Sequence, residues 1–149
     1  MRILILGGTS FFGKEAATRL HKAGNEVTVF SRRAPVDGLP LDIRQSRGER
    51  TAEIDLSRMS VEPWDVIIDN ICYTAEDAEK AVRVFNGRTG LYIFTSSASV
   101  YPLLEGAASP FRENQTELLQ LKGQLKEKYA YGLGKYAAER GFLQAFAEK

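Results

Sequence analysis

The sequence contains little that could form covalent cross-links or bind a metal ion. It has one cysteine, Cys72, and one histidine, His21, among 149 residues. A single cysteine excludes an internal disulfide and is typical of a reducing compartment. We interpret Cys72 as a small buried side chain. His21 belongs to no cluster of metal-ligating residues, so the sequence predicts no metal site.

An excess of charge of either sign is also missing, and so are long apolar runs. Twenty Lys and Arg residues against 19 Asp and Glu residues give a net charge of +1. This balance gives no electrostatic footprint for nucleic acid or for an anionic membrane. No apolar stretch approaches transmembrane length, and the apolar run at the N-terminus is too short for a signal peptide. We therefore expect a cytoplasmic protein with no nucleic-acid or membrane partner.

The remaining composition is that of a globular domain, with 44% apolar and 26% charged residues. Short apolar runs alternate with segments of helical periodicity. The expected strands are Arg2–Leu6, Glu26–Ser31, Leu41–Arg44, Asp65–Asp69 and Leu91–Phe94. The expected helices are Lys14–Ala23, a segment that opens with a capping box at Thr74 and closes at Gly87, Thr116–Lys128 and Tyr131–Glu148. Residues 45–60 are expected to be loop with a short helical turn.

This alternation predicts an α/β fold with a doubly wound parallel sheet, in which helices cover both faces and the strand order is 3-2-1-4-5. Such a three-layer Rossmann fold binds its ligands beyond the carboxyl ends of the strands. The glycine-rich turn, Arg32 with Arg33, Asp69 with Asn70, and residues 95–99 all lie at such ends. We expect them to form one site.

The segment Gly7–Gly13 joins the first strand to the first helix. A turn of this kind places backbone N–H groups and the positive end of a helix dipole at one point, which suits a phosphate. Gly7 would permit the tight turn, and Gly13 would let the helix pack against the strand. Ser10 stands where a glycine would let a ligand come closest, although its hydroxyl could donate to a phosphate. We predict that this turn holds the pyrophosphate of a dinucleotide; the alternative is a turn that binds nothing.

Tyr131 and Lys135 are four residues apart and share one face of a helix. An ammonium near a phenol lowers the phenol pKa from about 10, so such a tyrosine could exchange protons near neutral pH. Gly132 and Gly134 lie between them, and each costs about 1 kcal/mol relative to alanine inside a helix. This cost suggests a reason for the glycines, such as a cofactor lying against the backbone. The alternative is a chance Y-x-x-x-K pattern.

Hydroxyl groups follow the fifth strand at Ser96, Ser97 and Ser99. A hydroxyl at this edge can donate to a carbonyl oxygen as negative charge develops on it. The alternative for any one of these serines is an ordinary polar turn.

Four motifs in this order resemble the extended or atypical short-chain dehydrogenase/reductases, above all the NAD-dependent epimerase/dehydratase branch. They are Gly7–Gly13, Asp65–Asp69, Phe94–Tyr101 and Tyr131–Lys135. The resemblance implies that Tyr131 is the general acid/base, that Lys135 holds the nicotinamide ribose, and that Ser97 polarises the reacting C–O group. The implied chemistry is hydride transfer between a nucleotide sugar or a similar alcohol and a bound nicotinamide. Epimerase, dehydratase and reductase activities all stay open.

The resemblance also implies a cofactor site. Its residues are Gly7, Thr9, Ser10, Phe11, Phe12, Gly13, Ser31, Arg32, Arg33, Asp69, Asn70, Thr95 and Ser96, together with Tyr131 and Lys135. The acidic residue that usually follows the second strand is replaced by Ser31-Arg32-Arg33. Arginine suits a 2′-phosphate, which favours NADP over NAD. The alternative for Arg32 and Arg33 is that both are solvated surface side chains. The alternative for Asp69 and Asn70 is that they only cap the chain at the end of the strand. The resemblance also implies that Glu49 could approach the adenine.

Members of this family continue past the Tyr/Lys helix into a substrate-binding domain, whereas this chain ends at Lys149. The resemblance therefore implies one NAD(P)-binding domain over residues 1–149, with weak cofactor binding and little or no turnover. It also implies a homodimer through the helices expected at Thr116–Lys128 and Tyr131–Glu148. Two alternatives are a non-catalytic module that senses NADP(H) and an RNA-binding module; the balanced charge argues against RNA.

Overall fold

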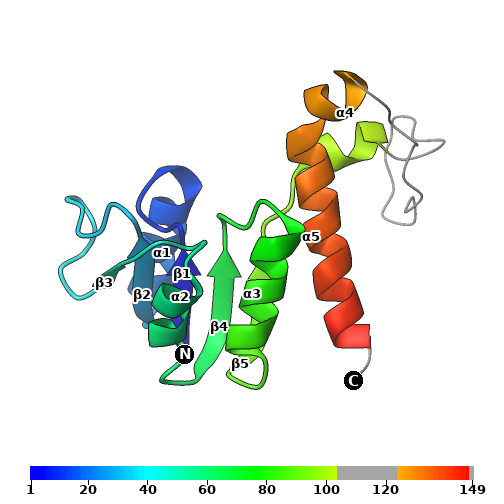
Figure 1. Cartoon of the computed structure of the whole chain (residues 1–149). Helices are drawn as coiled ribbons and strands as arrows, with labels where there is room; N and C mark the ends of the chain where they lie inside the picture. The colour runs from blue at the N-terminus through cyan, green and yellow to red at the C-terminus, as the bar shows by residue number, and fades with distance from the viewer. Residues whose placement is uncertain (104–123, 148–149) are drawn as a thin grey trace.

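A parallel β-sheet with helices on both faces forms the framework of the computed structural model, which describes residues 1–103 and 124–147 (Figure 1). The strands are β1 (Arg2–Leu6), β2 (Glu26–Ser31), β3 (Arg44–Arg47), β4 (Trp64–Asp69) and β5 (Thr89–Phe94). The helices are α1 (Phe11–Lys22), α2 (Glu53–Met59), α3 (Ala75–Phe85), the 3₁₀ helix η1 (Ala98–Leu103), α4 (Gln124–Lys128) and α5 (Ala130–Ala147). The strand order β3-β2-β1-β4-β5, all parallel, confirms the predicted fold class.

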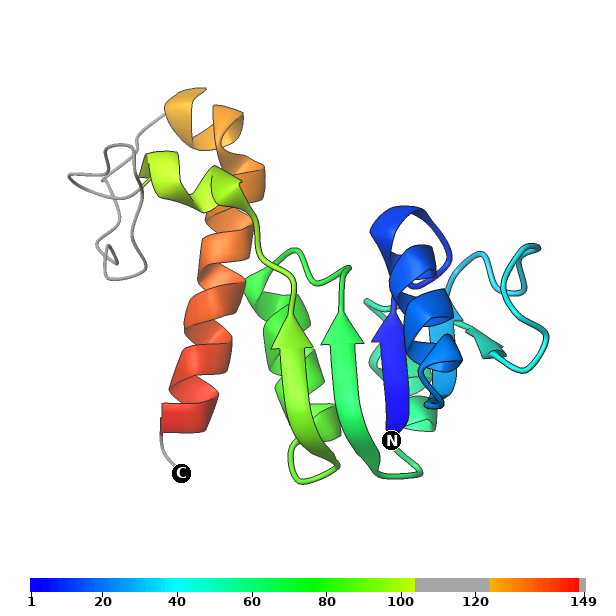
Figure 2. The same cartoon turned by 180° about the vertical axis from the view of Figure 1, so that it is seen from behind.

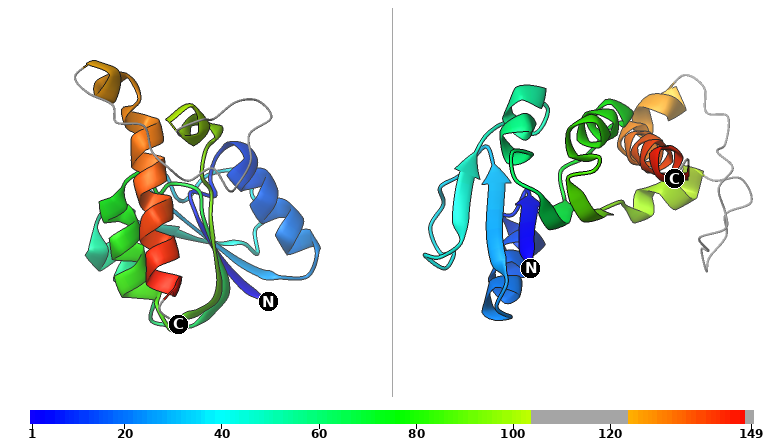
Figure 3. Two further views of the ribbon diagram at one scale, coloured as in Figure 1. Left: turned by 90° about the vertical axis from the view of Figure 1, so that its right-hand side faces the viewer. Right: turned by 90° about the horizontal axis from the view of Figure 1, so that it is seen from below.

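Alternate residues of the central strands feed two separate cores. Ile3 and Ile5 of β1 pack with Ala17 of α1 on one face, whereas Leu4 and Leu6 pack toward α2, α3 and α5 on the other. Figures 2 and 3 show α1 on one side of the sheet and α2 and α3 on the other. This pattern is expected for central parallel strands, which are apolar on both faces.

Helix α3 begins with the predicted capping box. The Thr74 side chain accepts a hydrogen bond from the Asp77 amide (3.1 Å), and the Asp77 carboxylate accepts one from the Thr74 amide (3.2 Å). These two bonds satisfy amides that the helix itself leaves unpaired. The helix therefore starts at a fixed point, immediately after the loop that follows β4.

Several predicted boundaries were wrong. The third strand lies at Arg44–Arg47, because Ile43 is buried in the α1-side core instead of belonging to the strand. Residues 53–59 form the seven-residue helix α2 within the segment predicted as loop with a short helical turn, and the buried Leu56 and the partly buried Met59 pack this helix against the core. Helix α1 starts at Phe11, three residues earlier than predicted. Of the helix predicted from residue 116, the structure describes only α4, and the rest lies outside the described residues.

Strand β5 is the outermost strand on its side of the described sheet, and it carries apolar side chains on both faces. Leu91 and Ile93 are 53% and 42% exposed on the same face of the sheet as α1, because they pair with Val66 and Ile68 of the α1-side core. Helix α1 lies beside β1 and does not extend over β5 (Figure 2). On the opposite face, the rings of Tyr92 and Phe94 contact Phe142 of α5 at centroid distances of 5.0 and 5.3 Å. The strand thus has the composition of an interior strand at an edge position.

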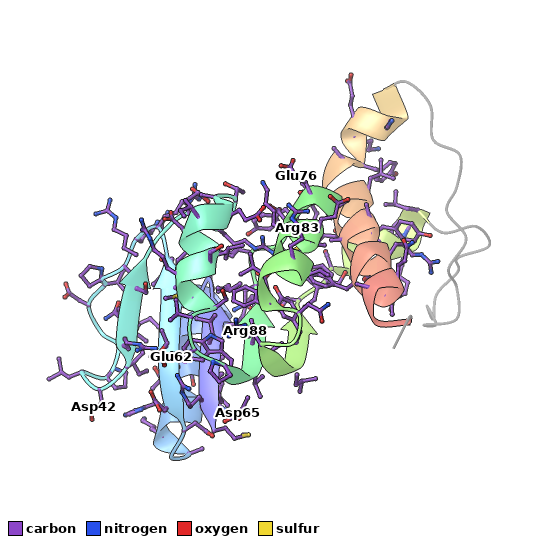
Figure 4. The ribbon with its side chains drawn as sticks, turned by 60° about the horizontal axis from the view of Figure 1, so that its bottom comes forward. Asp42, Glu62, Asp65, Glu76, Arg83 and Arg88 are labelled. Atoms are coloured by element: carbon purple, nitrogen blue, oxygen red, sulfur yellow. The ribbon has the colours of Figure 1, made fainter. Side chains whose placement is uncertain are left out.

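Charged side chains gather at the end of the sheet where the strands begin. Arg2 forms an ion pair with Glu62, and its amide donates to Asp65 at 2.6 Å (Figure 4). On the outer surface of the helices, Arg83 of α3 pairs with Glu53 of α2 at 2.9 Å. The groups at the strand starts are opposite to the carboxyl ends, where the candidate site lies. Among the described residues, no helix has the length and apolarity needed to cross a bilayer.

Candidate functional site

A cleft of about 340 Å³ opens beyond the carboxyl ends of β2, β1 and β4. Its walls come from the glycine-rich turn, the end of β2, the loop after β3 and the loop after β4. The lining residues are Gly7, Thr9, Ser10, Phe11, Ser31, Arg32, Arg33, Glu49, Arg50, Thr51, Ile71 and Tyr73. Seven of these residues were predicted as cofactor-binding; Glu49 was expected near the adenine, and Arg50, Thr51, Ile71 and Tyr73 were missed.

The glycine-rich turn has the geometry that the sequence predicted for it. Gly7 has φ = +84°, and a Cβ on Gly13 would lie 2.5 Å from the Gly7 carbonyl oxygen, so only glycine permits the contact between helix and strand. Ser10 is the N-cap of α1, but its side chain makes no hydrogen bond to the first amides of the helix. Those amides are therefore not capped by Ser10. Phe11 and Phe12 are 91% and 60% exposed, so their rings do not fill the turn.

The end of β2 is tied to this turn by hydroxyl groups. Oγ1 of Thr9 and Oγ of Ser31 are 2.9 Å apart, and the Arg33 amide donates to Ser31 Oγ at 3.0 Å. Arg32 pairs with Glu49 at 3.6 Å, with the two side chains 77% and 40% exposed. An exposed pair of this kind is worth little in free energy, so the Arg32 guanidinium is free to exchange Glu49 for another anion.

Lys135 lies at the other end of the site, beside the carboxyl ends of β4 and β5. It is 1% exposed, and its Nζ donates to the carbonyl oxygens of Cys72 (2.7 Å) and Thr95 (2.8 Å). An ammonium has three donor hydrogens, so these two bonds leave one without a hydrogen bond. The Nζ also lies 4.8 and 4.9 Å from the ring centroids of Tyr73 and Phe94. Burial lowers the pKa of Lys135.

Tyr131 and Ser97 come from neighbouring segments. Tyr131 is 52% exposed in the first turn of α5, and its ring lies 6.3 Å from that of Tyr73. Ser97 precedes η1, and its Oγ accepts a hydrogen bond from the Ser99 amide (3.2 Å), which leaves its O–H as a donor. Gly132 packs directly on Ser99, so the loop after β5 and the start of α5 are in contact.

The reason for the two glycines of α5 differs from the expectation. A Cβ on Gly132 would lie 2.4 Å from the Ser99 carbonyl oxygen, and one on Gly134 would lie 2.4 Å from that of Tyr73. The helix therefore lies against the backbone of this chain's own loops at the two positions where a cofactor was expected. These contacts set the distance of Tyr131 and Lys135 from the sheet.

The carboxylate of Asp69, predicted as a cofactor contact, is committed to a buried network. Asp69 is fully buried, and its Oδ2 accepts from Arg50 Nη2 (2.7 Å), Arg50 Nε (3.1 Å) and the Tyr92 hydroxyl (2.7 Å). Burial alone would lower the pKa of Arg50, but the Asp69 charge outweighs it and raises that pKa above its usual value. A carboxylate at the end of an apolar strand needs a buried cation, and this requirement is the sequence signal that could have found Arg50.

Asn70 connects the glycine-rich turn with the end of β5. Its Oδ1 accepts a hydrogen bond from Thr95 Oγ1 at 2.8 Å, and its Nδ2 lies beside the glycine-rich turn, 3.1 Å from the point where a Cβ on Gly13 would stand. Within the described residues, three buried side-chain atoms have no hydrogen-bond partner: Asn70 Nδ2, Arg50 Nη1 and Ser96 Oγ. Arg50 Nη1 lies 3.9 Å from the Asp77 carboxylate, whereas Asn70 and Ser96 follow neighbouring strands and place their unpaired atoms at the ligand edge.

These features fit the adenosine and diphosphate parts of a dinucleotide. The α1 amides and the unpaired Asn70 amide suit phosphate oxygens, and the absence of a side chain at Gly7 and Gly13 keeps the turn open. No group of three or more metal-ligating side chains occurs in the part of the chain that the structure describes.

Comparison with solved structures shows the same fold in UDP-glucose 4-epimerases and in a short-chain dehydrogenase/reductase superfamily protein. A UDP-glucose 4-epimerase from Bifidobacterium longum, solved with NAD⁺ and UDP, superposes over 100% of this chain and 50% of its own, with a TM-score of 0.76 and 17% identity. The Thermotoga maritima UDP-glucose 4-epimerase, solved with UDP-glucose, covers 100% of this chain and 52% of its own (TM-score 0.72, 18% identity). A short-chain dehydrogenase/reductase superfamily protein from Agrobacterium tumefaciens with bound NAD covers 97% and 45% (TM-score 0.74, 19% identity).

At these identities the comparisons show a shared fold, and they confirm the resemblance to extended short-chain dehydrogenase/reductases at that level. The chain spans about half the length of these solved structures. No protein-family model and no curated protein sequence matches it.

Proposed function

We propose that residues 1–149 form the nicotinamide-dinucleotide-binding part of an oxidoreductase of the epimerase/dehydratase type, with a nucleotide sugar as substrate. The observation that carries this proposal is the placement of Lys135. A buried ammonium is held by the carbonyls of Cys72 and Thr95 and lies 4.8 Å from the ring of Tyr73, a residue that lines the cleft together with the glycine-rich turn. The B. longum and A. tumefaciens structures, which have this fold, were solved with NAD.

A bound nicotinamide would supply hydride transfer, and this chain's own residues would control the proton. Tyr131, half-exposed beside the cleft, would take the proton from a substrate hydroxyl or return it to a carbonyl. Ser97 would donate its free O–H to the same oxygen, because its Oγ already accepts from the Ser99 amide. Lys135 would use its third donor hydrogen on a ribose hydroxyl.

We propose NADP(H) as the preferred cofactor because Arg32 and Arg33 are exposed at the β2 end of the cleft. Two guanidinium groups there suit a 2′-phosphate. Glu49 lies beside Arg32 and offsets part of this charge. Glu49→Gln should therefore strengthen NADPH binding relative to NADH, whereas Arg32→Ala combined with Arg33→Ala should weaken NADPH about tenfold or more, the size of one charged hydrogen bond. Equal affinities of the unaltered chain for NADPH and NADH would contradict the preference.

Thermal unfolding with each of the four nicotinamide nucleotides tests the cofactor part of the proposal. A ligand at a hundredfold excess over its dissociation constant stabilises the folded state by about 2.7 kcal/mol, which is about 5–10 °C in Tm for a chain of this size. Lys135→Met should reduce this shift, and Lys126→Met provides a matched control because Lys126 is exposed on α4, away from the cleft. No shift with any nucleotide would refute the proposal.

A further inference from the structure

Tyr73 connects the two parts of the candidate site. Its side chain lines the cleft together with the glycine-rich turn. Its ring lies 6.3 Å from the ring of Tyr131, and the ammonium of Lys135 lies 4.8 Å from the same ring. Tyr73 also directly follows Cys72, whose carbonyl holds Lys135. One side chain thus faces the cleft and contacts both members of the Tyr131–Lys135 pair.

The strand order explains why this position matters. The cleft begins beside Arg32 at the end of β2, passes the turn after β1, and reaches the loop after β4. Tyr131 and Lys135 lie one step further, next to β5, because Lys135 Nζ donates to the Thr95 carbonyl and Gly132 packs on the Ser99 carbonyl oxygen. An elongated ligand that starts at β2 must therefore pass Tyr73 before it reaches Tyr131.

The ring of Tyr73 is available to such a ligand. It is 46% exposed, so the side chain offers free surface to the cleft despite its contacts with Tyr131 and Lys135. Partial burial, followed by the neighbouring Tyr131, raises the pKa of Tyr73, and the phenol stays neutral at physiological pH. A neutral phenol presents an electron-rich face, which favours stacking against a flat ring.

We propose that the Tyr73 ring is the contact surface for the nicotinamide half of the dinucleotide and holds that half beside Tyr131. This inference rests on the proposed function. It makes Tyr73 a positioning residue: the ring acts through contact, and the hydroxyl is dispensable.

Binding measurements with Tyr73→Leu, Tyr73→Phe and Tyr129→Leu test this role. Tyr129 is the matched control because it precedes α5 on a turn and does not line the cleft. Titrations use NADPH, with the fluorescence of its reduced nicotinamide as a second readout, and ADP, which carries only the adenosine and diphosphate groups. Tyr73→Leu should weaken NADPH about three- to tenfold, the size of an aromatic pair, and change its bound fluorescence, while ADP affinity stays the same. Tyr73→Phe and Tyr129→Leu should match the unaltered chain.

Each other outcome refutes a defined part of the reasoning. Unchanged NADPH affinity in Tyr73→Leu, or an equal loss of ADP and NADPH, overturns the nicotinamide contact and leaves the proposed function standing. Loss of NADPH binding in Tyr73→Phe assigns the effect to the hydroxyl and overturns the ring contact. If the unaltered chain binds neither NADPH nor ADP, the proposed function fails together with this inference.

Discussion

Alanine substitutions at the glycines of α5 should have opposite effects on stability, although the three positions share one helix. Gly→Ala inside a helix gains about 1 kcal/mol from helix propensity. At Gly141 nothing opposes this gain, since the nearest atom to a new Cβ is Ala78 Cβ at 3.5 Å, an ordinary contact. At Gly134 the new Cβ would lie 2.4 Å from the Tyr73 carbonyl oxygen, so the helix or the loop must move.

Overpacking of this kind costs about 1–3 kcal/mol. Gly134→Ala should therefore change stability by between about zero and a loss of 2 kcal/mol, and Gly132→Ala should behave alike because it meets the Ser99 carbonyl oxygen at 2.4 Å. Gly141→Ala should raise Tm by about 2–4 °C, and the Gly134→Ala melt should lie below it by up to about 12 °C.

Urea unfolding of the three variants gives the free energies, and a nucleotide-induced shift in Tm reports the site. Gly134→Ala should reduce the NADPH-induced shift, because Lys135 follows directly and its Nζ must stay within reach of the Cys72 carbonyl. Gly141→Ala should leave the shift intact. If Gly134→Ala stabilises the chain as much as Gly141→Ala does, the close approach of α5 to the Tyr73 backbone does not hold the helix in place.

Two further predictions concern the buried groups beneath the site. Arg50→Met should lower the free energy of unfolding by about 3–5 kcal/mol, because it leaves the fully buried Asp69 carboxylate without its cation. Adding Asp69→Asn to the Arg50→Met chain should restore part of this loss. An unchanged urea midpoint in Arg50→Met would contradict the pairing. Burial raises the pKa of the Cys72 thiol to about 12, whereas an unfolded thiol ionises near pH 8.5. As the pH rises, the unfolded state therefore loses this proton first. Between the two pKa values, the free energy of unfolding falls by up to about 1.4 kcal/mol for each unit by which the pH rises. Cys72→Ala should remove that one-proton slope from unfolding measured between pH 9 and 10, and identical slopes in both chains would refute the burial of the thiol.

The sequence predicted the elements whose apolar pattern is strong and missed those whose pattern is weak. β1 and β2 lie where their apolar runs placed them, and α3 starts at its capping box. β3 is made of Arg-Gln-Ser-Arg and α2 buries little besides Leu56, so neither shows a periodic signal. Both are stabilised mainly by contacts with elements distant in the sequence, which local pattern does not record.

The candidate site likewise contains residues that the sequence predicted and residues that it missed. The glycine-rich turn was predictable because a tight turn and a close contact between strand and helix require glycine at fixed spacing, and the structure confirms the geometry of Gly7 and Gly13. Arg50 and Tyr73 were missed because their importance comes from partners found only after folding, at distances of 19 and more than 50 residues along the chain. The roles of Ser97, Tyr131 and Lys135 stay predictions, and the Lys135→Met measurement tests the last of them.

The position of β5 at the edge of the described sheet has a consequence for unfolding. Thr89–Phe94 contains no charged residue and no proline, the two devices that commonly protect an exposed strand from joining another chain. Because Leu91 and Ile93 are half-exposed, partly unfolded molecules can associate through this apolar edge strand. Heating should thus end in aggregates at high concentration and become reversible on dilution.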